Sequence, residues 1–233
     1  MELQNVGRGS VVDIVVEQIK NLILNEVIKP GEKIPTEIEL MEQLGVGRNS
    51  VREAIKMLTA LGVLEVKRGQ GTYVATKVEP SFFDPFIFSL LLEPKSNQDL
   101  YELRVMYDSM VAFTALSNGT SEEFNVLEKN IDEMEAAYKS GEHADNIDFF
   151  VEKDMSFHRI LLRSTHNPLI IKMGEAILGL FPKYIKKSIS QDKGIERSIE
   201  NHRTILRTIR EKDVIHIHLS IEKTLEEWKR NWE

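Results

Sequence analysis

A turn of three residues, Gly45-Val46-Gly47, is the feature of this sequence that most constrains its fold. Before the turn, Thr36 can cap a short helix, and Glu39 three residues later completes a capping box. After the turn, apolar residues recur from Val51 to Leu61 at three- and four-residue steps, which is typical of an amphipathic helix. Two helices joined by so short a turn predict a helix-turn-helix.

The segments on either side extend this pattern to a winged helix. A first helix is expected over Val12–Ile28 and ends at Pro30-Gly31. After the third helix, two short β-prone runs at 63–66 and 72–74 flank Lys67-Arg68-Gly69-Gln70-Gly71, a combination that indicates a hairpin. Three helices and a small hairpin within about 65 residues are typical of a winged helix-turn-helix.

The remainder of the chain is predicted to be a linker followed by helices. Three prolines indicate a linker that includes an apolar island at Phe82–Leu92 and is expected to contain a short helix. Six helical patterns without β signals follow it, one of them over Pro168–Ser190. Five methionines are expected to line the core and the pocket walls of this helical half: Met106, Met110, Met134, Met155 and Met173.

The predicted fold class is therefore mainly α, with two domains. We expect a winged helix-turn-helix domain over residues 1–76, made of three helices and a β-hairpin. The linker covers residues 77–96. An all-helical bundle with its own core is expected over residues 97–233.

The composition restricts the class of protein and its partners. Cysteine is absent, which excludes a disulfide framework and a thiolate metal site. No apolar run is long enough for a membrane span, and the N-terminus lacks the pattern of a secretory signal, so a cytoplasmic protein without a membrane partner is expected. The net charge of −7 argues at first against a nucleic-acid partner, but residues 1–76 carry only −1 of it and residues 48–71 carry +3.

The first turn and a half of the predicted third helix carries the strongest chemical signal. A helix-turn-helix presents side chains at this position to base edges in the major groove of DNA. Arginine suits that role because its guanidinium can bind O6 and N7 of guanine together, with about 1–3 kcal/mol of discrimination. The alternative is a polar surface turn whose Arg52 pairs with an acidic residue. The candidate contacts of this helix are Arg48, Asn49, Ser50 and Arg52.

The hairpin supplies a second set of candidate DNA contacts. Lys67 and Arg68 bring two cations, and the glycines keep the loop compact enough to enter a narrow groove, where cations are attracted. An ordinary charged hairpin tip would have the same composition. Lys67, Arg68 and Gly69 are therefore candidate contacts, and Thr36 at the start of the second helix is added to them.

The N-terminal motifs follow one another in a fixed order: Pro30-Gly31-Glu32-Lys33-Ile34-Pro35-Thr36-Glu37, Leu44-Gly45-Val46-Gly47-Arg48, Val51-Arg52-Glu53-Ala54 and Gly69-Gln70-Gly71-Thr72-Tyr73-Val74. Together they resemble the GntR family of bacterial regulators. The resemblance implies that Arg48 and Arg52 contact operator bases, with residues 49–50 beside them, and that Arg68 and Gly69 enter the minor groove. The family commonly has an arginine where this sequence has Ile38, so one phosphate or base contact is missing and the operator rules of the family do not carry over intact.

The helical half carries looser motifs, again in a fixed order: Glu102-Leu103-Arg104, Asp154-Met155-Ser156-Phe157-His158, Asn167-Pro168-Leu169 and Asn201-His202-Arg203. Over roughly 97–229 they resemble the FCD domain, the effector domain of the FadR subfamily. The resemblance implies a small carboxylate effector and a divalent metal, such as Zn or Ni, held by one Asp and three His. Asp154, His158 and His202 match the ligand pattern, and Thr224 stands where the third histidine is expected.

Two interpretations of these polar residues remain open. Asp154 and His158 lie one helical turn apart, and with His202 they could hold a metal whose remaining positions are filled by water or an effector carboxylate. His216 and His218 are too far from position 224 to replace the third histidine cleanly. Alternatively, the first two residues form a surface pair and His202 hydrogen-bonds in the core.

Arg104 is a further candidate for the effector site. It lies in an apolar helical stretch, where a guanidinium that faces the interior needs an anion. The resemblance implies that this anion is the effector carboxylate, and the alternative is a salt bridge with Asp108 one turn on. We expect a single cavity in the bundle, formed by Arg104, Asp154, His158 and His202, with Thr224 in the effector site.

The function that follows is that of an allosteric regulator, expected to be a repressor. A homodimer would read two half-sites of double-stranded operator DNA, and a metabolite in the helical domain would alter DNA binding. The alternative is a metal-dependent enzyme that uses Asp154, His158 and His202, but no nucleophile or acid–base pair accompanies that trio. A nucleoid protein without sequence preference is disfavoured because few cations are available for phosphate contacts.

Overall fold

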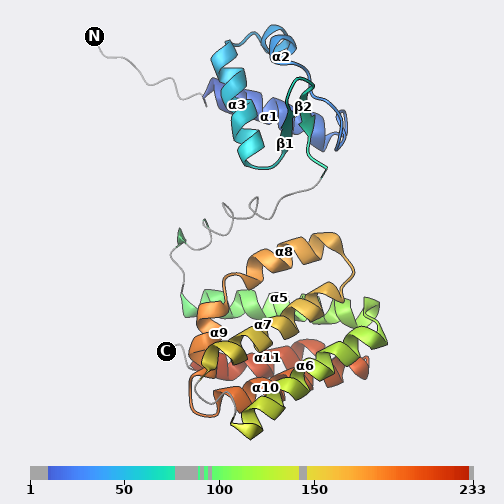
Figure 1. The fold of residues 1–233 in the computed structure, drawn as a ribbon, viewed down its shortest axis with the longest axis vertical. Helices are drawn as coiled ribbons and strands as arrows, with labels where there is room; N and C mark the ends of the chain where they lie inside the picture. Colours follow the sequence, from blue (N-terminus) through green and yellow to red (C-terminus); the bar gives the residue numbers. More distant parts are fainter. Residues whose placement is uncertain (1–9, 77–88, 90–91, 94–95, 142–145, 231–233) are drawn as a thin grey trace, which may run out of the picture. The chain divides into compact units, whose positions relative to one another are not determined.

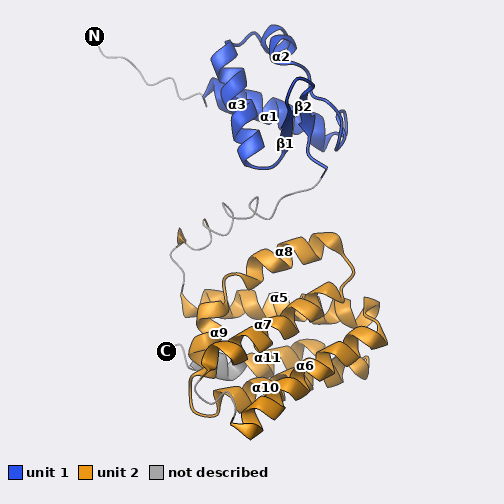
Figure 2. Cartoon of the chain, in the orientation of Figure 1, with its two compact units in different colours: residues 1–86 blue, residues 87–233 orange. Residues whose placement is uncertain are grey.

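The computed structural model describes residues 10–76, 89, 92–93, 96–141 and 146–230, with the side chains of 226–230 left out. The chain divides into two compact units, residues 1–86 and 87–233 (Figures 1 and 2). The predicted linker helix and the apolar island at Phe82–Leu92 lie almost entirely outside the described residues. Among the helices that are described, none combines the length and the apolar character needed to cross a membrane.

Unit 1 has the predicted winged-helix arrangement. Its helices are α1 (Val11–Leu24), α2 (Glu37–Leu44) and α3 (Arg48–Ala60). The hairpin that follows consists of β1 (Leu64–Lys67) and β2 (Gly71–Val74), which pair antiparallel. Helix α1 ends four residues earlier than the apolar pattern indicated, because Glu26 takes a left-handed φ of 56° and the amides of Val27 and Ile28 turn back to the carbonyl of Leu22.

Local sequence signals explain the helix-turn-helix. The Thr36 hydroxyl accepts a hydrogen bond from the Glu39 amide, and the Glu39 carboxylate accepts one from the Thr36 amide at 2.7 Å, so the expected capping box is present. These bonds lower the pKa of Glu39. At the other end of α2, Gly45 adopts a left-handed φ of 64°, a conformation that glycine takes without steric cost.

The core of unit 1 is formed by one face of each helix and closed by the hairpin. Helix α1 packs on α3, and the strands add one buried residue each. A bridge between Lys33 and Tyr73 also ties the segment before α2 to the free side of β2, which the sequence pattern did not indicate. The buried residues are Val15, Ile19, Ile34, Leu40, Val51, Ala54, Ile55, Leu58, Leu64 and Val74.

Unit 2 is a bundle of seven described helices (Figure 1). They are α5 (Asn97–Asn118), α6 (Ser121–Ser140), α7 (Ile147–Arg163), α8 (Pro168–Leu178), α9 (Pro182–Ile189), α10 (Gly194–Arg210) and α11 (Ile217–Arg230). The prediction of one helix over Pro168–Ser190 is wrong, because the chain turns at Gly179–Phe181 and Pro182 starts a new helix. Proline has no amide proton to continue the preceding helix and is well placed in a first helical turn.

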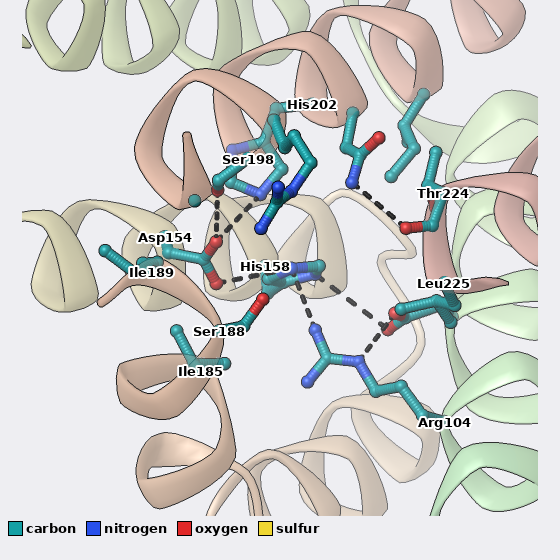
Figure 3. A pocket seen from close by; sticks show the side chains of 15 residues that line it. Arg104, Asp154, His158, Ile185, Ser188, Ile189, Ser198, His202, Thr224 and Leu225 are labelled. Atoms are coloured by element: carbon teal, nitrogen blue, oxygen red, sulfur yellow. Dashed lines mark hydrogen bonds and ion pairs between the residues drawn. The ribbon is translucent and has the colours of Figure 1, made fainter. Parts of the chain in front are cut away.

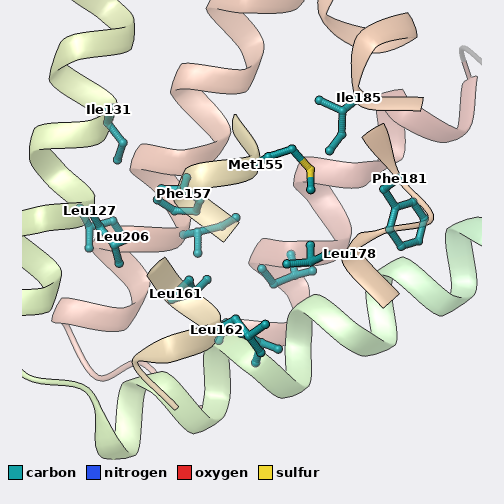
Figure 4. Packing of buried hydrophobic residues seen from close by; sticks show 14 of the residues in the cluster. Leu127, Ile131, Met155, Phe157, Leu161, Leu162, Leu178, Phe181, Ile185 and Leu206 are labelled. Atoms are coloured by element: carbon teal, nitrogen blue, oxygen red, sulfur yellow. The ribbon is translucent and has the colours of Figure 1, made fainter. Parts of the chain in front are cut away.

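The helices of unit 2 enclose a continuous apolar core. Helix α5 packs against α7, α8, α10 and α11, and α6 packs against α7 and α10. Figure 4 shows Leu127 and Ile131 of α6 beside Phe157 and Leu161 of α7. Met134 and Met155 are buried in this core, as expected. The prediction is wrong for the other three methionines, Met106, Met110 and Met173, which are exposed on α5 and α8.

We expect Gly45→Ala to weaken the helix-turn-helix. A Cβ at this position meets no other atom within 4 Å, so the cost of about 1 kcal/mol comes from the left-handed backbone alone. Amide hydrogen exchange in α2 and α3 should accelerate about fivefold. Gly47→Ser is the matched control, because Gly47 has a φ of −74° and equally open surroundings. Equal exchange rates in both variants would contradict this account of the turn.

Candidate functional site

The candidate DNA contacts of α3 lie on the surface of unit 1. The guanidinium groups of Arg48 and Arg52 both approach the carboxylate of Glu37, at 3.6 and 3.9 Å. Exposed pairs at such separations contribute little energy, so both arginines remain available to DNA. Asn49 is exposed and Ser50 half-buried beside them. The alternative in which Arg52 pairs with an acid is therefore present in the structure, as a weak contact.

The start of α2 contributes two side chains with different surroundings. The Thr36 hydroxyl is engaged in the capping box, where it also donates to the Glu39 carboxylate at 2.8 Å. Ile38, which replaces the arginine expected from the resemblance, is 67% exposed. The first turn of α2 therefore presents an apolar side chain where a cation was expected.

The tip of the hairpin is exposed and cationic. Lys67, Arg68 and Gly69 are all exposed, and the Lys67 ammonium lies 4.6 Å from the centre of the Tyr73 ring. Gly69 has a φ of 76°, which explains the glycine in this turn. The amide of Gln70 donates to the Lys67 carbonyl and closes the turn at 2.9 Å. A compact loop thus presents two cations.

Unit 2 contains a cavity of about 70 Å³ (Figure 3). Helices α5, α7, α9, α10 and α11 all contribute to its walls. The first residue of α10, Gly194, lies so close to the end of α9 that a Cβ there would stand 2.3 Å from the Ser188 carbonyl oxygen. This close approach helps to set where α10 begins and so places Ser198 and His202 on the cavity wall.

The structure brings Asp154, His158 and His202 together. One carboxylate oxygen of Asp154 lies 3.4 Å from Nε2 of His202, and the other lies 3.7 Å from Nε2 of His158. The three side chains are buried, and each offers a ligand atom within 4.8 Å of the others. The surface-pair alternative for Asp154 and His158 is therefore wrong, because α7 turns this face toward α10.

Arg104 forms the salt bridge with Asp108 that was the alternative considered for it, and it also contacts His158. Its Nε donates to the Asp108 carboxylate at 2.7 Å, and its Nη2 donates to Nε2 of His158 at 2.8 Å. The guanidinium also lies 4.7 Å from the centre of the Phe181 ring. Because a guanidinium only donates, His158 must present the lone pair of Nε2 and carry its proton on Nδ1. That proton faces the Asp108 carboxylate, 3.9 Å away.

Sequence reasoning missed the contacts of Ser198 with Asp154 and of Asp108 with His158. It also did not foresee that the Thr224 hydroxyl bonds within its own helix. The Ser198 hydroxyl donates to Asp154 at 2.6 Å, a contact that its position one turn before His202 could have suggested. Asp108 was considered only as a partner of Arg104. Thr224 lines the cavity, but its hydroxyl donates to the Ile221 carbonyl at 2.7 Å.

Burial sets the charges inside the cavity. It lowers the pKa of His158 well below the usual value, and the charge of Arg104 acts in the same direction. It also lowers the pKa of His202, against the opposing effect of Asp154. Burial raises the pKa of Asp108, which Arg104 partly offsets. Both imidazoles are therefore neutral near pH 7, the form that binds metals.

The residues fit a divalent metal in part. Tetrahedral ligands at about 2.1 Å from a zinc ion stand roughly 3.4 Å apart, close to the separations of Asp154 from the two histidines. Asp154, His158 and His202 would hold the ion, which would supply open positions for an anion. Two features oppose it, since Arg104 occupies the lone pair of His158 and Thr224 offers no imidazole.

Comparisons with known proteins agree with both halves of this description. Residues 12–74 match the family described as bacterial regulatory proteins, gntR family, and residues 99–226, more than half of the chain, match the FCD domain. The chain is a GntR-type transcriptional regulator with an FCD domain. Its relatives are transcriptional regulators and not enzymes, so the alternative of a metal-dependent enzyme is set aside.

Similar proteins extend over nearly the whole regulator. The HTH-type transcriptional regulator YcbG of Bacillus subtilis is 28% identical, over 94% of this chain and 88% of that protein. The galactonate operon transcriptional repressor of Escherichia coli is 26% identical, over 86% of this chain and 87% of that protein. A solved GntR structure from Streptococcus agalactiae has a TM-score of 0.56 at 26% identity, and the match covers 94% of this chain and 99% of that one.

We expect unit 2 to lose stability as the pH falls below about 6.5. The pKa values of His158 and His202 are lowered in the folded chain, so the unfolded chain binds more protons there. Each histidine can then change the free energy of unfolding by up to about 1.4 kcal/mol per pH unit. Denaturant titrations between pH 5 and 7 measure this by tryptophan fluorescence, since both tryptophans belong to residues 97–233.

The control is the double variant His158→Gln/His202→Gln. Its stability should depend less steeply on pH than that of the unmodified chain. Asp108 contributes with the opposite sign, because its pKa is raised, but it is present in both proteins and largely cancels in the comparison. Parallel pH profiles would show that the two histidines are not buried as neutral groups.

Proposed function

We propose that this regulator is a repressor of the FadR subfamily that binds operator DNA as a homodimer and is controlled by a small organic acid in the cavity of unit 2. The observation that carries the effector proposal is the buried guanidinium of Arg104 beside two neutral imidazoles in a cavity. We place the DNA-binding domain at 1–76, the linker at 77–96 and the effector domain at 97–233. The chain would act in the cytoplasm, where bacterial DNA lies.

The proposed DNA interface has one set of residues that contact bases and another set that contact the grooves and the phosphate backbone. Arg48 and Arg52 read base edges in the major groove, with Asn49 and Ser50 beside them. Arg68 and Gly69 of the hairpin approach the minor groove, and Lys67 and Thr36 contact the backbone. All of these residues except the half-buried Ser50 are exposed, and Glu37 pairs only weakly with the two arginines, which supports these roles.

The proposed effector is an anion of limited size. An organic acid suits the cavity because Arg104 is 2% exposed and can offer part of its donor fork to a carboxylate. The Escherichia coli relative is named for the galactonate operon, and galactonate is itself a carboxylate. We propose that Asp154, His158 and His202 hold a divalent metal such as Zn or Ni when it is present, and that Thr224 contributes to the wall of the effector site.

The proposed homodimer uses an apolar stripe on unit 2. Met106, Met110 and Phe113 follow one another at four- and three-residue steps along α5 and are all exposed, Met106 to 65%. Helix α8, which packs on α5, exposes Leu169 and Met173 as well. Exposed apolar side chains gathered on two packed helices favour an interface, and a two-fold dimer matches a two-fold operator. We therefore place a second copy of the chain on α5 and α8.

We expect Arg48→Ala and Arg52→Ala each to weaken specific DNA binding by about 1–3 kcal/mol, because each removes a contact to a base. An operator selected from random DNA would serve as the probe in gel-shift titrations. Lys20→Ala is the matched control, since Lys20 is an exposed cation of the same unit that pairs with Glu17 on α1. Unchanged affinity in both arginine variants would remove α3 from the DNA interface.

We expect the double variant Met110→Glu/Phe113→Glu to be monomeric. Two carboxylates placed in an apolar interface would lose their hydration there without gaining a partner. Sedimentation velocity at micromolar concentration measures the change. Val126→Glu on α6 is the control, because Val126 is a similarly exposed apolar residue outside the stripe. A dimeric double variant, or a monomeric unmodified chain, would contradict this assignment.

A further inference from the structure

The lone pair on Nε2 of His158 has two possible uses. In the structure it accepts a hydrogen bond from Nη2 of Arg104 at 2.8 Å. A metal held by His158 through the nitrogen that faces Asp154 would need the same lone pair, at about 2.1 Å. The other ring nitrogen carries the proton and faces Asp108. Arg104 and a metal ion would therefore use the same nitrogen, Nε2 of His158.

We propose that Arg104 competes with the divalent metal for His158 and thereby sets the metal affinity of this regulator. The proposal rests on the metal site proposed above and adds a role for a residue outside its ligand set. An ion bound to the lone pair of Nε2 at about 2.1 Å would lie between Nε2 and Nη2, which are 2.8 Å apart, so the ion and Nη2 cannot use that lone pair together. Metal binding must displace Nη2.

The packing of Arg104 makes this competition stronger than it would be at a surface. Asp108 holds Nε at 2.7 Å and Phe181 covers the guanidinium, so the side chain is fixed at its base and cannot swing into solvent. The cation that the metal must displace therefore stays inside the cavity. Its charge opposes that of the ion across a short, poorly solvated distance. The wild-type site should accordingly hold metal weakly.

The displaced guanidinium has a further consequence. Once Nη2 has left His158, the protons on Nη2 need a new acceptor, because a buried donor without a hydrogen-bond partner lowers the stability of the folded chain. An anion in the cavity would supply that acceptor. The metal and an anionic ligand should therefore favour each other's binding, by the reciprocity that links any two coupled sites.

The experiment uses the purified, metal-free full chain and Co²⁺ as a spectroscopic probe. The test variant is Arg104→Gln/Asp108→Asn, which removes both charges of the ion pair together and so does not leave the Asp108 carboxylate buried without its cation. We expect this variant to bind Co²⁺ at least tenfold more tightly than the unmodified chain. Adding His158→Gln should abolish the gain in affinity. Circular dichroism checks that each variant keeps its helices.

Arg197→Gln is the matched control for a general effect of charge. Arg197 also lines the cavity, but its guanidinium donates to the Asp192 carbonyl, and no hydrogen bond or ion pair described among the cavity residues joins it to His158 or His202. Its loss should change Co²⁺ affinity less than threefold. A gain as large as that of the double variant would overturn the proposal, because it would trace the effect to net charge and not to the bond with His158.

A second measurement needs no variant. In imidazole ¹⁵N spectra of the metal-free chain, His158 should carry its proton on Nδ1 and show a hydrogen-bonded Nε2. Zn²⁺ should replace that bond and shift the Arg104 guanidinium resonances. Binding of Zn²⁺ with the Arg104–His158 bond intact, or equal Co²⁺ affinity in the double variant, would overturn the competition while leaving the metal site in place. Absence of metal binding in every protein would overturn both.

Discussion

The buried guanidinium of Arg104 is the interaction on which the interior of the helical unit depends. It ties Asp108 on its own helix to His158 on α7, and it is covered by Phe181 at the turn between α8 and α9. Removing one partner of a buried ion pair leaves an uncompensated charge, at a cost of about 3–5 kcal/mol. A cation at this depth therefore dictates that carboxylates and imidazoles gather around it, and so accounts for a polar cavity within an apolar bundle.

The arginines of unit 1 differ from Arg104, because their ion pairs are weak and exposed to solvent. Arg48 and Arg52 lie at the surface and share Glu37 at separations of 3.6 and 3.9 Å, where water screens the attraction. A DNA phosphate or a guanine edge can replace such a partner at little cost. The cations proposed to contact DNA are therefore weakly paired, and the cation proposed to bind the effector is held by a buried ion pair. The first arrangement suits a binding surface and the second a preorganised pocket.

The sequence predicted the winged helix well because its signals are local. The Thr36–Glu39 capping box and the left-handed Gly45 each depend on residues only a few positions apart. The helical unit was harder to predict. Apolar spacing continues through 168–190, so the break before Pro182 was missed, and the exposed methionines of α5 and α8 resemble core residues in a periodic pattern. Hydrogen bonds such as Ser198 to Asp154, across 44 residues, depend on how helices pack and leave only a faint trace in the sequence.

The charges already present in the cavity determine what an anionic effector would need in order to bind there. Arg104 is already largely neutralised by Asp108, and both imidazoles are neutral. A carboxylate that entered this cavity alone would find Asp154 as an unfavourable neighbour. It needs either a divalent ion on Asp154 and the histidines, or a guanidinium turned away from His158. In the proposed competition the ion would itself turn the guanidinium away, so one binding event would supply both conditions. Thr224, in place of a third histidine, would then leave a ligand position for the anion.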